Sequence, residues 1–361
     1  MRKTTLQLFV LASTMALFVL PLSAQVAGND ANPSAFYDFS AEYIQATGKR
    51  CGTPSRETRA MLYGLGTEGA SDCSSSSTNP TSDYDPNVLY QIQVVVHVLM
   101  NDACTQGVLS DEDVQSQIDI LNEDFLALMG TNGANGNDAQ IQFVLASQDP
   151  EGQPTTGITR NCNTTWFNDG GGYWNTLAWD PHRYMNVYTN TASGALGYVP
   201  FLPADNNGNN VGNANDRVVV LWSSFGRDGV IGPPYNQGRT GTHEVGHYLG
   251  LEHTFTGGCG DNTPPGCYSD GDLICDTNDE QFPGSSPCQV GASSSCGSVD
   301  PTDNYMDYSD DLCMEQFTVE QNRRMRCTLE TYRPNLFTNV TDIFADGFES
   351  GDVTSWSGTI P

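Results

Sequence analysis

The stretch that decides the fold reads Gly241-Thr242-His243-Glu244-Val245-Gly246-His247-Tyr248-Leu249-Gly250-Leu251-Glu252-His253. Residues four apart lie on one face of a helix, about 6 Å from each other. The spacing therefore predicts that His243 and His247 direct ring nitrogens at one ion. Gly250 is able to adopt a positive φ and end the helix, which lets the chain return His253 as a third ligand. Three imidazoles suit Zn²⁺ and leave its fourth position open, as in catalytic zinc sites.

Glu244 lies one residue round the helix, so it cannot share this ligand direction but can lie beside a water bound to the ion. The alternative is a surface helix with solvated histidines. Three of the five histidines fall in this segment, and chance would produce the full spacing in on the order of one chain in 10⁵. Of the other two, His97 is expected to be a hydrogen-bonded core residue and His182 a turn residue.

The composition narrows the class of protein. A chain of 361 residues is long enough to form one large domain or two small ones. Its net charge of −28 argues against nucleic acid and anionic membranes as partners, because both need a basic face. Eleven cysteines are many for a cytosolic enzyme and are typical of an oxidising compartment.

The two ends of the chain differ from its middle. Residues 1–24 have the pattern of a secretory signal peptide, with Arg2 and Lys3 before an apolar run. The alternative is a membrane anchor, but the run is short and no basic residues flank its end. No stable membrane insertion is therefore expected, and the protein is expected to be secreted. Residues 25–85 form a separate segment, of which 71–86 has the composition of an exposed linker. Residues 339–361 form a short acidic tail.

The hydrophobic pattern of the middle predicts strands interleaved with helices. Strands are expected at 91–99, 139–147, 183–189, 196–201 and 218–222, and helices at about 111–128 and 318–332. Ser110 with Asp113, and Thr318 with Gln321, have the spacing of capping boxes at the two helix starts. This alternation indicates an α/β layer structure.

Two further motifs follow the histidine segment, Asp303-Asn304-Tyr305-Met306-Asp307-Tyr308-Ser309-Asp310-Asp311 and Cys313-Met314-Glu315-Gln316-Phe317-Thr318. With residues 243–253 they resemble the metzincin metallopeptidases, and within them the ulilysin-like members of the pappalysin family. The resemblance covers residues 86–338. It implies an α/β (α+β) metzincin-type catalytic domain with a twisted mixed sheet and two long helices above the cleft. A loop-rich, disulfide-bonded lower subdomain with one C-terminal helix would complete it.

The resemblance also implies a function, that of a secreted zinc endopeptidase acting on proteins or peptides. Glu244 would be the general base that activates the zinc-bound water. Met306 would be the Met-turn residue beneath the zinc ligands, and Tyr308 would approach the metal and the tetrahedral intermediate. An antiparallel edge strand at about 196–201 would pair with extended substrate. Two other functions stay open, a non-catalytic extracellular binding or adhesion module and a zinc exopeptidase or amidase.

Cys51, within Arg50-Cys51-Gly52-Thr53, resembles the pro-segment cysteine of latent pappalysin-type enzymes. Residues 25–85 are therefore interpreted as a pro-segment and linker. A thiolate at Cys51 would fill the fourth position of the zinc and keep the enzyme a zymogen. The alternative is a disulfide between Cys51 and Cys73.

The remaining cysteines are only partly assigned. The family pattern implies bridges Cys259–Cys296 and Cys288–Cys313, and Cys267 and Cys275 in an insertion are expected to bridge each other. Cys73, Cys104, Cys162 and Cys327 stay without predicted partners.

An oxygen-rich loop follows the histidine segment and contains Asp270, Asp272, Asp276, Thr277 and Glu280. Family members carry calcium nearby, and oxygen ligands suit Ca²⁺. A structural calcium site is therefore expected at Asp272, Asp276, Thr277 and Glu280. The spacing is not that of an EF-hand, and a solvated acidic loop is the alternative. The sequence does not determine the substrate, the mature N-terminus or the oligomeric state.

Overall fold

The computed structural model describes residues 49–64, 71–284, 291 and 293–340. The chain divides into the unit Met1–Asp38, which lies outside the described residues, and the unit Phe39–Pro361, to which everything below refers. The expected signal peptide at 1–24 and all but two residues of the expected tail at 339–361 lie outside the described residues.

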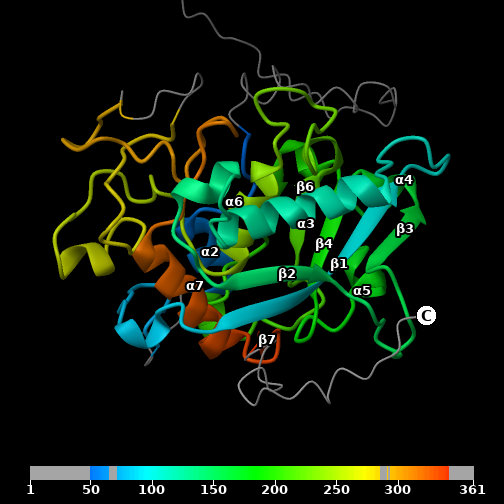
Figure 1. The fold of residues 1–361 in the computed structure, drawn as a ribbon, viewed down its shortest axis with the longest axis horizontal. Coiled ribbons are helices and arrows are strands. Elements are labelled where there is room, and N and C mark those ends of the chain that lie inside the picture. Colours follow the sequence, from blue (N-terminus) through cyan, green and yellow to red (C-terminus); the bar gives the residue numbers. More distant parts are fainter. Residues whose placement is uncertain (1–48, 65–70, 285–290, 292, 341–361) are drawn as a thin grey trace, which may run out of the picture. The chain divides into compact units, whose positions relative to one another are not determined.

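A mixed sheet of seven strands forms the centre of the unit (Figure 1). The strands are β1 (Leu89–Met100), β2 (Ile141–Leu145), β3 (Ile158–Cys162), β4 (Met185–Asn190), β5 (Gly197–Tyr198), β6 (Val218–Leu221) and β7 (Phe337–Val340). The order is β2-β1-β4-β6-β5, and β3 and β7 also pair with β1. β2, β3 and β4 run parallel to β1, and β6 runs parallel to β4. β5 is antiparallel to β6 and β7 to β1, so the predicted antiparallel edge strand is confirmed.

Two helices cover one face of this sheet, α3 (Asp111–Phe125) and α6 (Arg239–Tyr248). α3 packs against β2 and α6, and α6 packs against β6. The predicted capping box of α3 is present, since Ser110 and Asp113 bond each other's backbone amides. α3 ends at Phe125 rather than at about residue 128, because Ala127 adopts a positive φ of 46°.

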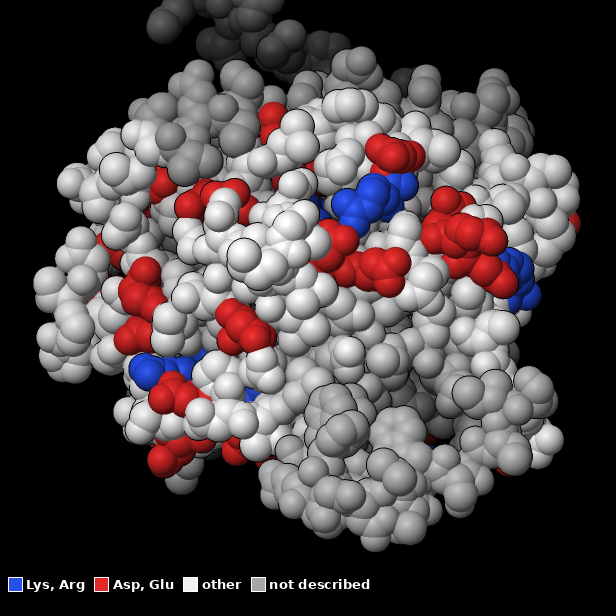
Figure 2. Space-filling model, in the orientation of Figure 1, with Lys and Arg blue, Asp and Glu red and all other residues white. Residues whose placement is uncertain are grey.

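The described residues between α6 and the predicted C-terminal helix are mostly loops. α7 (Val319–Tyr332) begins with the predicted capping box of Thr318 and Gln321. The other helices of the described residues are α2 (Arg56–Tyr63), α4 (Thr164–Phe167) and α5 (Trp174–Leu177), with single 3₁₀ turns at Ser82–Tyr84, Asn132–Asn135, Ala192–Gly194, Asp205–Gly208, Trp222–Ser224 and Gly266–Tyr268. Among the described helices, none has the length and apolar character that a membrane span requires. Asp and Glu are spread over the face drawn in Figure 2, with fewer Lys and Arg among them.

The prediction of an exposed linker at residues 71–86 is wrong for residues 73–75 and 78, which are buried, whereas residues 77, 79, 82 and 83 are exposed. Cys73 is fully buried and forms a disulfide with Cys327 of α7. Arg324 of the same helix donates hydrogen bonds to the carbonyl oxygens of Ser74 (2.8 Å) and Ser77 (3.3 Å). The first part of this stretch therefore packs on α7, a helix far along the chain that satisfies part of its backbone. The alternative Cys51–Cys73 bridge is excluded by the same disulfide.

The described residues contain four disulfides. The expected Cys259–Cys296 and Cys267–Cys275 bridges are confirmed, and Cys73–Cys327 and Cys104–Cys162 join the cysteines that had no predicted partner. Cys313 is disulfide-bonded, and its expected partner, Cys288, lies outside the described residues.

Candidate metal centre

The helix α6 and its exit place three imidazoles together. Gly250 has a φ of +97°, as the sequence predicts, and a Cβ there would come within 2.5 Å of the Thr328 hydroxyl. The chain turns back at this point, where the Leu251 amide donates to the Gly246 carbonyl at 3.0 Å. The Nε2 atoms of His247 and His253 are 3.0 Å apart, and the ring of His243 lies 4.7 Å from that of His247.

Backbone carbonyls fix the orientation of two of these rings. Nδ1 of His243 bonds the Tyr305 carbonyl and Nδ1 of His247 bonds the Leu251 carbonyl, each at 2.7 Å. These bonds place the Nδ1 proton and leave Nε2 of each ring free to act as a ligand. Burial lowers the pKa of His247 to about 4 and that of His243 well below its usual value. Both rings are therefore neutral at pH 7, the form that binds a metal.

One buried atom shows that the donor set fits a metal ion. Nε2 of His243 is buried and has no hydrogen-bond partner in the protein, and such an atom is costly to leave unpaired. Ligand atoms of Cys51, His243, His247 and His253 all lie within 4.8 Å of one another, the single such group of His, Cys, Asp and Glu found in the described part of the chain. Three nitrogens and one sulfur match the tetrahedral preference of Zn²⁺.

Glu244 lies beside this group. Its side chain is fully buried, and burial raises its pKa to about 8. One carboxylate oxygen, Oε2, accepts from the Thr53 hydroxyl at 3.2 Å and from the Cys51 thiol at 3.6 Å. The other, Oε1, has no partner. Glu244 is thus positioned to exchange a proton with a group at the metal centre.

The segment 50–53 covers the centre and pairs with the edge strand β5. The Gly52 amide donates to the Gly197 carbonyl at 2.8 Å, and the Leu196 amide donates to the Arg50 carbonyl at 3.1 Å. The Val199 amide donates to the Thr53 hydroxyl at 2.9 Å. The bridge between Cys51 and Gly197 is parallel. The segment therefore occupies the backbone groups that β5 would offer to an extended peptide.

Arg50 lines a small pocket next to the centre, together with residues that include Thr240, His243 and Tyr308. Its guanidinium donates to the Tyr308 and Ser309 carbonyls and lies 3.7 Å from the Asp311 carboxylate. The ring of Tyr235 lies 4.5 Å from the guanidinium carbon. Sequence reasoning singled out the stretch around Cys51 but gave Arg50 no contact, because nothing local links it to residues 308–311.

Met306 lies against α6, and Tyr308 lies beside two of the histidine rings. Met306 is fully buried beneath α6, and a Cβ at Gly246 would collide with its sulfur. The Tyr308 ring lies 5.0 Å from that of His253 and 5.8 Å from that of His243. Burial raises the pKa of Tyr308 well above its usual value, so its phenol keeps its proton.

The oxygen-rich loop does not converge on one point. Asp272 accepts from the Thr277 hydroxyl at 2.8 Å, and Asp276 accepts from the Glu320 amide at the start of α7 at 2.9 Å. Glu280 accepts from the Thr254 hydroxyl at 3.0 Å. Each side chain has its own partner, and none of them belongs to a metal-ligating group among the described residues. The calcium site stays a prediction.

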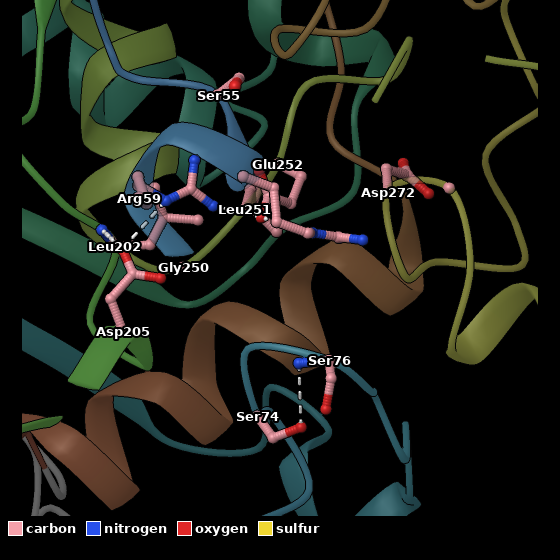
Figure 3. Close-up of polar contacts among 12 residues, drawn as sticks. Ser55, Arg59, Ser74, Ser76, Leu202, Asp205, Gly250, Leu251, Glu252 and Asp272 are labelled. Carbon is pink, nitrogen blue, oxygen red and sulfur yellow. Dashed lines mark hydrogen bonds and ion pairs between the residues drawn. The ribbon is translucent and has the colours of Figure 1, made fainter. Parts of the chain in front are cut away.

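Sequence reasoning missed a buried ion-pair cluster that includes Glu252, the residue directly before His253 (Figure 3). Arg59 of α2 lies between Asp205 and Glu252, and Arg56 also contacts Glu252. Although burial opposes ionisation, Arg59 and Arg56 hold the pKa of Glu252 at about 2. The feature of the sequence that could have indicated this cluster is Glu252, because an acidic residue within a buried motif needs a cationic partner.

Comparison with known proteins agrees with this geometry. Residues 174–330 match the peptidase M43 family, described as pregnancy-associated plasma protein-A. An extracellular metalloprotease of Verticillium alfalfae is 32% identical over 291 residues, which are 78% of this chain and 89% of that protein.

Two solved structures share the fold. Mature mirolysin of Tannerella forsythia, in complex with a cleaved peptide, is 33% identical with a TM-score of 0.56, over 70% of this chain and 99% of that one. A mutant of Tannerella forsythia promirolysin is 30% identical with a TM-score of 0.61, over 80% of this chain and 97% of that one. The chain therefore belongs to the pappalysin family of metzincins and is a zinc metalloendopeptidase.

Proposed function

We propose that this enzyme is secreted as a latent precursor in which Cys51 occupies the fourth ligand position of a zinc held by His243, His247 and His253. The observation that carries the proposal is the group of four donor atoms, one from each residue, within 4.8 Å of one another. Cys51 is also the one free cysteine among the described residues, so its thiol is available to a metal.

Glu244 is the proposed general base of the active form. Zinc bound at the three histidines would supply a Lewis acid and lower the pKa of a water near it. Glu244 takes the proton of the attacking water and then gives it to the leaving amine. Its buried position suits this exchange, because a carboxyl group with a raised pKa holds and releases a proton near neutral pH.

Tyr308 and β5 complete the proposed site. The Tyr308 phenol, protonated and close to two of the histidine rings, donates to the oxyanion that forms from the scissile carbonyl. The Gly197 carbonyl and the Leu196 and Val199 amides pair with the substrate backbone once residues 50–53 leave. Proteins or peptides in extended form are therefore the proposed substrates.

Two comparisons support latency and secretion. The likeness to promirolysin extends over 80% of this chain, against 70% for mature mirolysin. The additional coverage is what a chain that carries a pro-segment would show. The relatives are named extracellular metalloproteases, which agrees with the signal-like residues 1–24.

The test compares the full-length precursor with its Cys51→Ala variant on a quenched fluorescent peptide. The wild-type precursor is expected to be inactive until it is cut between residues 51 and 73 or treated with a mercurial. Cys51→Ala is expected to cleave peptide without either treatment, and a zinc chelator is expected to abolish that activity. The cut must precede Cys73, because a cut after it would leave the pro-segment tethered through the Cys73–Cys327 disulfide.

The mercurial provides the internal control, because it is expected to leave the rate of Cys51→Ala unchanged. A Cys51→Ala precursor as inactive as the wild type would contradict the role of Cys51. A processed enzyme that cuts no peptide in a library would contradict the proposed catalytic site and favour a binding module.

A further inference from the structure

The buried ion-pair cluster of α2 is built to hold a guanidinium. Arg59 is 2% exposed, Asp205 1% and Glu252 4%. Nε of Arg59 donates to Asp205 at 2.9 Å, one terminal nitrogen donates to Glu252, and the other donates to the Pro54 carbonyl at 2.7 Å. Three sides of the guanidinium therefore have acceptors, and two of those acceptors are carboxylates.

The two carboxylates belong to the catalytic domain, whereas the guanidinium belongs to the pro-segment. Asp205 follows β5 and is held by the Leu202 amide, which donates to it at 2.8 Å. Glu252 directly precedes the proposed ligand His253. A cut between Arg59 and Cys73 removes Arg59 and Arg56 together with the proposed pro-segment. The acidic pair then loses both cations with which it forms ion pairs.

Arg324 is another cation near the acidic pair, but it cannot take the place of Arg59 and Arg56. Arg324 of α7 lies close enough to Glu252 to feel its charge, but its guanidinium bonds the carbonyls of Gly250 and Ser74, at 2.8 Å each. It is therefore committed to the backbone. Two carboxylates without a counter-ion repel each other and favour any cation that reaches them.

The location of the pair relative to β5 determines which part of a substrate it meets. Residues 50–53 run parallel to β5, with Cys51 opposite Gly197 and Thr53 bonded to Val199. α2 follows them, so the cluster lies beyond the C-terminal end of β5. An extended peptide that pairs antiparallel with β5 would place there the residues on the N-terminal side of its scissile bond.

We propose that Asp205 and Glu252 form a substrate subsite that binds an arginine or lysine side chain on the N-terminal side of the cleaved bond, and that Arg59 occupies this subsite in the precursor. The inference rests on the proposed function. A forked guanidinium that meets two carboxylates gains charge-assisted hydrogen bonds in fixed geometry, so arginine is preferred over lysine.

The experiment uses the processed enzyme and quenched fluorescent peptides that differ at one of the four positions before the cleaved bond. In each set of peptides, one of these positions carries arginine, lysine or citrulline and the other three stay constant. Citrulline has the shape of arginine without its charge. The residue after the bond is kept constant, because Arg50 of the same precursor lies at a different place, beside His243 and close to Asp311. At one position, kcat/KM for arginine is expected to exceed that for citrulline at least about tenfold.

Asp205→Asn is expected to reduce this arginine-to-citrulline ratio to about threefold or less, because a neutral amide replaces one carboxylate. The matched control is Glu151→Gln in the exposed turn between β2 and β3, which should leave the ratio unchanged. The ratio does not depend on how much enzyme is folded, so partial unfolding of Asp205→Asn cannot imitate the effect.

The outcomes separate the two proposals. Equal rates for arginine and citrulline at all four positions, in an enzyme that cleaves the peptides, would overturn the subsite alone. A ratio that Asp205→Asn leaves unchanged would overturn the assignment to these residues. Failure of the processed enzyme to cleave any peptide would overturn the proposed function and this inference with it.

Discussion

Arg50 anchors the pro-segment beside the metal centre. Arg50→Met is therefore expected to weaken latency, and it leaves the side chains of the proposed catalytic residues unchanged. Methionine keeps much of the length of the side chain but removes the charge and every donor. The guanidinium donates to two carbonyls, of Tyr308 and Ser309, and lies 3.7 Å from Asp311. Asp311 is itself buried, and burial raises its pKa although Arg50 opposes this effect.

The magnitude follows from these contacts. A hydrogen bond from a charged donor contributes about 1.5 kcal/mol or more, so the two carbonyl bonds together contribute about 3 kcal/mol. Loss of the cation beside a buried carboxylate adds to this figure. Since about 1.4 kcal/mol is a factor of ten, the closed form should be disfavoured by about 10²-fold. The uncut precursor should then show about 10² times more activity than the wild type, up to the rate of the processed enzyme.

The assay measures the initial rate of peptide cleavage by the precursor while a gel shows that the chain is intact. Lys49→Met is the matched control, because it removes an exposed cation next to Arg50 and should stay as latent as the wild type. If Arg50→Met is no more active than Lys49→Met, the contacts of Arg50 do not hold the pro-segment closed, and the reasoning is refuted.

Four further predictions concern other parts of the chain. Glu244→Ala should bind zinc but lose activity by 10²-fold or more, and a variant that keeps over about a hundredth of the activity would contradict the general base. Replacing Cys73 and Cys327 by serine should lower the free energy of unfolding by up to about 5 kcal/mol, measured in denaturant, because 254 residues separate the pair. Burial lowers the pKa of His97 to about 4 from 6.5, so the unfolded chain binds the extra proton first. Stability should therefore fall by about 3 kcal/mol as the pH drops from 6.5 to 4, and His97→Gln should remove this part of the pH dependence. A chelator should lower the melting temperature in a way that calcium, and not zinc, restores. No such loss would leave the acidic loop around Glu280 as a hydrogen-bonded structure without an ion.

The parts of the fold that the sequence predicts correctly depend on local signals. A capping box needs two residues three apart, and those of α3 and α7 occur at the expected positions. The spacing of His243, His247, Gly250 and His253 likewise fixes a turn of helix and a positive φ without information from elsewhere. The buried strand β6, Val218–Leu221, is an apolar run that hydropathy alone identifies.

What the sequence missed depends on contacts between distant residues. β3 is a polar pentapeptide, Ile158–Cys162, that becomes a strand because it pairs with the second half of β1. Residues 71–86 have the composition of a linker, and contacts with residues far along the chain, among them the disulfide to Cys327 and the hydrogen bonds of Arg324, bury part of them. Neither the pairing of β3 with β1 nor the contacts of residues 71–86 with α7 can be recognised from the local sequence. Hydropathy and composition therefore predict that both segments are exposed.

Latency also depends on which contacts of the pro-segment are specific. The backbone bonds of Arg50 and Gly52 to β5 need no particular side chain, so any extended peptide could make bonds of that kind. They cannot explain why one segment blocks the enzyme while another is cut. Two differences remain: residues 50–53 run parallel to β5, opposite to the direction inferred for a substrate, and they place the thiol of Cys51 and the hydroxyl of Thr53 against Glu244. A substrate that reproduced the backbone pairing without these two groups would leave the carboxylate of Glu244 free to take a proton.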